Sequence, residues 1–135
     1  MKITKNIIIQ LVNHAKKEVP IEACGYLGAK DGVITAIYAL TNVDKSSEHF
    51  SFAPKEQFAA LRDAREKDLE ICAVYHSHPV SPARPSEEDI AKAYDPEILY
   101  VIVSLAQGKE DIRAFRIKNK TVGQVDLEII DNVRI

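Results

Sequence analysis

Two segments with continuous apolar centres limit the fold more strongly than any other feature of the chain. They occupy residues 69–78 (LEICAVYHSH) and 97–105 (EILYVIVSL). A strand with one wet face alternates apolar and polar residues, whereas the centres of these runs do not, so we expect two neighbouring strands buried on both faces. Such strands need other elements to cover both sides of their sheet, and this requirement predicts helices packed on a sheet.

The flanking segments supply those elements. A helix over residues 4–19 is predicted, with Thr4 as N-cap, and a second over 54–68, which opens on Pro54 and places Phe58, Leu61 and Ala64 at helical spacing. The apolar stripe of the first helix comprises Ile7, Ile8, Leu11, Val12, Ala15 and Val19. Strands are predicted over 23–29 and 33–42 as a hairpin, over 49–53, and over 112–119 and 121–130. The expected fold is a single α+β domain, residues 1–135, with a mixed or mostly antiparallel sheet covered by helices.

Composition and charge exclude several classes of protein. The chain has 135 residues and a net charge of -2, which gives no electrostatic basis for binding nucleic acid or an anionic membrane. No apolar run approaches the roughly 20 residues of a membrane span. Gln10, Asn13 and His14 interrupt the N-terminal isoleucine run, so we expect no secretory signal and a cytoplasmic protein. Cys24 and Cys72 are expected to be reduced and buried, although a nucleophilic role for Cys24 stays open.

The strongest chemical signal is the segment that follows the first apolar run. His76 and His78 stand at the end of that predicted strand, where alternation directs both side chains to one face, about 7 Å apart along the chain. The next residues, PVSPARP, carry three prolines that stiffen the loop, and Ser86 then opens a predicted helix. We therefore expect two imidazoles held on a rigid corner of the fold.

Asp89, three residues after Ser86, has two interpretations. Ser86-Glu-Glu-Asp89 matches a capping box, in which Asp89 would only bind the helix N-terminus. His-x-His with one carboxylate is also the three-ligand set of a catalytic zinc, which leaves a fourth position for water. Such a water needs a nearby carboxylate that accepts its proton without binding the metal. Glu87 and Glu88 are adjacent to Asp89 on the helix and would mostly point elsewhere.

The full motif resembles the signature of the JAMM (MPN-plus) zinc metalloproteases. It combines Glu22 in PIEACGYLGA with His76-Ser-His78, Ser86 and Asp89 at the family's spacing, and the likeness extends over nearly the whole chain. The resemblance implies a cytidine-deaminase-like JAMM/MPN sandwich and one zinc ion bound by His76, His78 and Asp89. It implies that Glu22 holds the catalytic water and transfers its proton, and that Ser86 stabilises the oxyanion.

The same resemblance suggests a substrate. The chain is close to the bare domain and is similar to the compact prokaryotic branch of the family. That branch is associated with ubiquitin-like sulfur carriers that end in Gly-Gly, from which it releases a cysteine, another amino acid or a peptide. Two alternatives stay open: a JAMM peptidase that processes cell-wall or phage-tail peptides, and a non-enzymatic MPN-type interaction module with a structural zinc.

Overall fold

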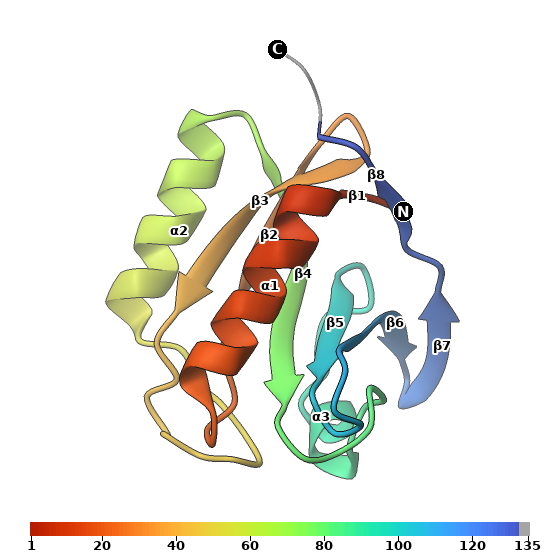
Figure 1. Ribbon diagram of the computed structural model, residues 1–135. Helices are drawn as coiled ribbons and strands as arrows, with labels where there is room; N and C mark the ends of the chain where they lie inside the picture. Colours follow the sequence, from red (N-terminus) through yellow and green to blue (C-terminus); the bar gives the residue numbers. More distant parts are fainter. Residues whose placement is uncertain (133–135) are drawn as a thin grey trace.

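The computed structural model describes residues 1–132, and one mixed eight-stranded sheet organises them (Figure 1). The strands are β1 (Lys2–Thr4), β2 (Cys24–Lys30), β3 (Val33–Leu40), β4 (Glu70–His78), β5 (Leu99–Ser104), β6 (Asp111–Lys118), β7 (Thr121–Val125) and β8 (Glu128–Ile130). The helices are α1 (Lys5–Glu18), α2 (Pro54–Glu66) and α3 (Glu87–Ala91). The strand order is β7-β6-β5-β4-β2-β3-β1-β8, which confirms the predicted mixed α+β fold.

The two apolar runs form the centre of this sheet, as predicted. β4 pairs with β5 in parallel, from Ala73 opposite Leu99 to His78 opposite Ser104, and pairs with β2 in the antiparallel sense on its other side. Alternate β4 residues serve two cores: Ala73 and Tyr75 pack with α1, whereas Val74 faces the core beneath α2. The predicted β2–β3 hairpin is also present. The side chains of His76 and His78 therefore lie on the same face of the sheet as α2.

The first helix differs from its prediction at both ends. Ile7, Leu11 and Ala15 are buried, but Val19 is 50% exposed because α1 ends at Glu18 and the backbone turns away there. Thr4 stands at the N-cap, yet its side chain makes no capping hydrogen bond. Its backbone belongs instead to β1, so the residue ends a strand as well as preceding a helix. None of the helices within residues 1–132 has the length and apolar character needed to cross a bilayer.

The predicted apolar face of α2 was partly wrong. Phe58 is 67% exposed, whereas Ala60 and Ala64 are buried and Leu61 is partly buried. The face that meets the sheet thus carries small side chains, which allow the helix backbone to approach the strands closely. The prediction placed Phe58 on the buried face because of its spacing from Leu61 and Ala64. In the structure, Ala60 takes that place and Phe58 faces outward.

Two predicted strands also differ from the structure. Residues 49–53 form a loop with a single bridge, Asn42 to Phe52, and the predicted strand 121–130 is divided into β7 and β8. β7 pairs with β6, but β8 crosses to the opposite edge of the sheet and pairs in parallel with β1. The backbone N–H of Glu128 donates to the carbonyl of Met1 at 2.9 Å, which joins the two ends of the described chain.

Gly25 is the one glycine of the described strands at which the sheet leaves no room for a side chain. A Cβ there would collide with the Tyr38 carbonyl oxygen and would lie 2.6 Å from the Tyr75 ring. We expect Gly25→Ala to lower the free energy of unfolding by about 1–3 kcal/mol or more, because neither a strand backbone nor a buried ring can move freely. Urea denaturation measures this loss. Gly123→Ala is the matched control, since nothing lies within 4 Å of its added Cβ, and equal stability of the two variants would contradict the prediction.

Candidate metal centre

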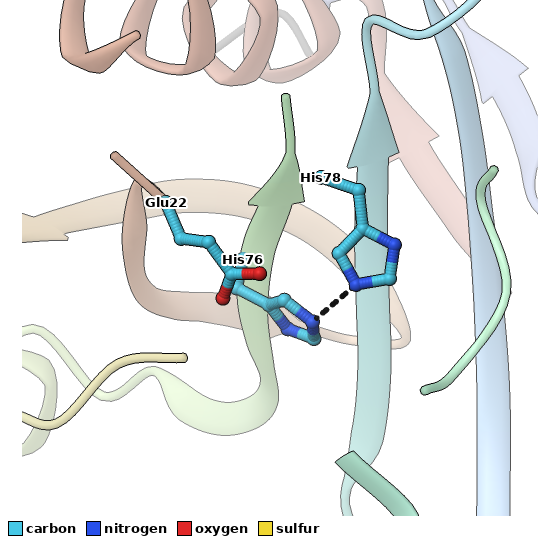
Figure 2. A group of neighbouring side chains, drawn as sticks. All are labelled: Glu22, His76 and His78. Atoms are coloured by element: carbon cyan, nitrogen blue, oxygen red, sulfur yellow. Dashed lines mark hydrogen bonds between the residues drawn. The ribbon is translucent and has the colours of Figure 1, made fainter. Parts of the chain in front are cut away.

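The end of β4 brings the two predicted histidines together. His76 and His78 are each 3% exposed, and their Nε2 atoms lie 3.1 Å apart (Figure 2). Ser77 points to the other face, where its Oγ accepts a hydrogen bond from the Ala23 N–H at 2.8 Å. The Ser77 N–H in turn donates to the Ala23 carbonyl at 3.0 Å. Ser77 is therefore a structural link between β4 and the segment that precedes β2, as the alternation of the strand predicted.

Helix α3 brings Asp89 to the same point. Its Oδ2 lies 3.1 Å from the Nε2 of His76 and 3.1 Å from the Nε2 of His78. The same oxygen accepts the Ser86 N–H at 2.9 Å, while Ser86 Oγ accepts the Asp89 N–H at 3.1 Å, which completes the predicted capping box. The two interpretations of Asp89 are thus compatible, because the cap aims the carboxylate at the histidines.

Glu22 reaches the site from the segment just before β2. It is 3% exposed, and one of its carboxylate oxygens lies within 4.8 Å of the ring nitrogens of both histidines (Figure 2). Its Oε1 is buried and has no hydrogen-bond partner among the described residues. Burial raises the pKa of Glu22 to about 8, and the nearby Asp89 adds to this effect while His78 opposes it. The raised pKa favours the protonated, uncharged form of this carboxyl group beside the histidine pair.

Hydrogen bonding determines which ring nitrogen of His78 faces the site. Its Nδ1 lies 2.8 Å from the Pro82 carbonyl, which can only accept, so Nδ1 carries the proton and a neutral ring presents the lone pair of Nε2. Burial alone would lower the pKa of His78, but the contacts with Asp89 and Pro82 raise it. Burial would raise the pKa of Asp89, yet its close contacts with both histidines hold it well below its ordinary range.

The donor atoms fit a tetrahedral metal ion. Ligand bonds of 2.0–2.2 Å at tetrahedral angles place neighbouring donors about 3.3 Å apart. The two Nε2 atoms and Asp89 Oδ2 form a triangle with 3.1 Å sides. Glu22 also falls within 4.8 Å of the histidine nitrogens, so it is an alternative third ligand. The shorter distances favour Asp89, and the partnerless Glu22 oxygen marks a position beside the triangle where a further group would bind.

Sequence reasoning missed two residues that shape this site. The ring of Phe50 stacks on His76, with centroids 5.0 Å apart and planes inclined by 29°. Asn42 is 4% exposed, and its Nδ2 donates to the carbonyls of Glu22 and His49, each at 3.0 Å. In the sequence, Asn42 only ended the predicted strand over 33–42, and Phe50 lay within the predicted strand over 49–53. An asparagine directly after an apolar strand was the available signal, since buried amides commonly organise loops.

The two cysteines are poorly suited to act as nucleophiles. Cys24 and Cys72 are free and buried, as predicted. Burial raises the pKa of the Cys24 thiol to about 12 and that of Cys72 to about 11. Because the thiolate is the nucleophile, these shifts argue against the nucleophilic alternative for Cys24.

Comparison with known proteins agrees with the motif and the fold. Residues 4–118 match the family described as prokaryotic homologs of the JAB domain. The chain belongs to this family. It is a JAMM-type metalloprotease of the compact prokaryotic branch, and the predicted enzymatic role is confirmed, whereas the interpretation as a non-enzymatic module is not.

Three similar proteins illustrate the match to this JAMM protease. The CysO-cysteine peptidase of Mycobacterium tuberculosis is 27% identical over 132 residues, which cover 96% of this chain and 90% of that protein. A probable TtuB-protein conjugate cleaving protease of Thermus thermophilus is 35% identical over 76% of this chain and 66% of its own length. The solution structure of protein DSY2949 from Desulfitobacterium hafniense is 38% identical, with a TM-score of 0.89 over 98% of this chain and 94% of that chain.

The buried Glu22 carboxyl predicts a pH dependence of stability. Its pKa rises from 4.5 in the unfolded chain to about 8 in the folded one, so folding favours the protonated carboxyl group. The free energy of unfolding is therefore highest below pH 4.5 and falls as the pH rises toward 8. Glutamine does not ionise. In the metal-free JAMM protease, we expect the unfolding free energy of Glu22→Gln relative to wild type to increase by a few kcal/mol across this window. Denaturant titrations at several pH values test this, with exposed Glu66→Gln as control. A difference that stays constant with pH would contradict it.

Proposed function

We propose that this JAMM protease hydrolyses the bond after the C-terminal Gly-Gly of a ubiquitin-like sulfur-carrier protein. The observation that carries the proposal is the buried carboxyl group of Glu22 beside the triangle of His76, His78 and Asp89, because its Oε1 has no hydrogen-bond partner within residues 1–132. Burial of an unpaired carboxyl group lowers the free energy of unfolding. Its presence is explained if a reacting group binds next to it.

The proposed metal ligands are His76, His78 and Asp89, which would bind one zinc ion per chain. Bound zinc lowers the pKa of a water molecule and polarises a carbonyl group, which is the chemistry of peptide hydrolysis. The chain's own contribution is to orient the ligands: the Pro82 carbonyl holds the ring of His78, and the capping box of Ser86 holds Asp89. These outer contacts keep the donor atoms in place.

Glu22 is the proposed general base. A group that takes a proton from water and returns it to the leaving amine works best when its pKa lies near the working pH, and burial moves Glu22 in that direction. Ser86 is the proposed oxyanion donor. Its Oγ uses a lone pair to accept the Asp89 N–H, so its hydroxyl proton remains free to donate to the substrate oxygen.

The carrier substrate rests on chemistry and on similarity. Glycines lack Cβ, so a Gly-Gly tail lets its backbone come close to a buried centre whose two histidines are each 3% exposed. The similar protein of Mycobacterium tuberculosis is named as a CysO-cysteine peptidase, and that of Thermus thermophilus as a protease that cleaves TtuB conjugates. Both names describe cleavage at a junction between a named protein and an attached group, which supports the same reaction type here.

Single substitutions should separate metal binding from proton transfer. His78→Ala and Asp89→Ala should lose most of their zinc, measured by metal analysis, because each removes a donor. Glu22→Gln should retain zinc but lose about 10²–10⁴-fold in turnover, since it cannot accept a proton. Ser86→Ala should lower turnover by about 10²–10³-fold and stability by about 1 kcal/mol.

His49→Ala is the control for this series, because His49 bonds Asp44 outside the triangle and should keep full zinc content. Loss of zinc in Glu22→Gln would show that Glu22, rather than Asp89, is a ligand.

A carrier protein extended beyond its terminal Gly-Gly tests the reaction itself. We expect mass spectrometry to show release of the extension with the globular carrier intact, and chelation to abolish this release while circular dichroism retains the folded signal. Replacing both carrier glycines by alanine should slow cleavage strongly, because methyl groups obstruct close approach. An extended carrier that stays intact while unrelated peptides are cut would overturn the carrier proposal and favour a general peptidase.

A further inference from the structure

A cavity of about 440 Å³ opens beside the metal centre, and the proposed proton transfers make no use of it. His76 and Asp89 form part of its lining, so it is continuous with the site. Its other walls are largely apolar and aromatic: Tyr26, Phe50, Phe52, Val74, Tyr100 and Ile102. Its volume is within the range that holds a small ligand or a large side chain.

The aromatic rings form a continuous wall that begins at His76. Phe50 stacks on His76, Phe52 lies 5.5 Å from Phe50, and Tyr26 lies 5.0 Å from Phe52, measured between ring centroids. The Tyr26 hydroxyl oxygen accepts a hydrogen bond from Gln57 Nε2 at 2.7 Å, and the hydroxyl of Tyr100 donates to the Asp95 carbonyl at 3.1 Å. Because these polar ends already have partners, the tyrosines contribute chiefly their rings to the cavity.

The charged side chains that line the cavity would not stabilise a negatively charged ligand. Glu88, Asp89, Asp95 and Lys92 all line it, and the Lys92 ammonium is paired with Glu88 at 2.9 Å. Because Asp89 is a proposed zinc ligand, a bound zinc ion would offset its charge, which leaves the negative charge of Asp95. An anionic side chain would be repelled there, whereas an uncharged apolar one would gain from leaving water.

We propose that this cavity receives the side chain of the residue that directly follows the scissile bond, and that it selects a large apolar residue, aromatic or aliphatic. This inference rests on the proposed function and extends it to the leaving group. The two glycines have no side chains to fill the space. The residue before them lies about 7–10 Å from the scissile carbonyl in an extended tail, whereas the cavity begins at His76 and Asp89 themselves.

Binding, rather than cleavage, gives the direct test. Zinc-loaded Glu22→Gln protein is titrated by NMR with the acetylated, amidated peptides Gly-Gly-Phe and Gly-Gly-Ala. We expect the phenylalanine peptide to bind roughly 10- to 100-fold more tightly, the range set by burying one aromatic side chain. Peptides with phenylalanine before the glycines, and alanine after them, should show no such gain.

Substitutions that fill the cavity locate the effect. Val74→Phe places a ring in the floor on β4, and Ile98→Phe does so from the loop before β5, should the first variant fold poorly. Each should bring the preference for phenylalanine close to one. Phe58→Ala is the matched control, since it removes an aromatic ring that is 67% exposed on α2 and does not line the cavity, and it should retain the preference.

Equal affinity for the two peptides, or a preference that survives both filled variants, would overturn the inference. Cleavage of carriers extended by phenylalanine or alanine then distinguishes it from the proposed function. Uncut carriers together with an intact peptide preference would contradict the function while supporting the cavity's role. If both carriers are cut and neither the rate nor the binding depends on the residue after the glycines, the function is supported and the cavity's role is contradicted.

Discussion

The metal centre depends on the convergence of two imidazole nitrogens and one carboxylate oxygen, each 3.1 Å from the other two. This arrangement is demanding because the three groups come from two elements, β4 and α3, and because the histidines are nearly fully buried. The central position of β4 supplies the rigidity, since its backbone is paired on both sides. The capping box supplies the direction, since Asp89 can face the histidines only where Ser86 starts the helix.

The approach of Glu22 depends on a different set of contacts. Its N–H donates to the Ser46 carbonyl at 2.8 Å, and its own carbonyl accepts from Asn42. Asn42 also holds the carbonyl of His49, next to the Phe50 ring that covers His76. One buried amide therefore joins the segment carrying the carboxylate to the loop that carries an aromatic wall. Loop residues usually move more than strands, and this amide ties the loop to the rigid sheet.

The sequence predicted the features that depend only on residues close together in the chain. Alternation along β4 placed His76 and His78 on one face and Ser77 on the other, and a four-residue box defined the start of α3. Glu22 lay beyond such reasoning, because it stands 54 positions before His76, and only family resemblance identified it. The pairing of β8 with β1 joins the two ends of the described residues, and no local pattern encodes it. The exposure of Phe58 also depended on which face of α2 meets the sheet.

Electrostatics and packing oppose each other at this centre. Burial that protects the site from water also raises the pKa of Glu22 to about 8, so the folded chain holds a carboxyl group that would be ionised in water at neutral pH. Such a group reduces stability above its ordinary pKa, and the surrounding apolar packing must offset the loss. The adjacent aromatic wall adds to that packing while it leaves a cavity of about 440 Å³ open at His76. The Phe50 ring thus has two roles, because it covers His76 at the metal centre and also forms part of the apolar wall of the cavity.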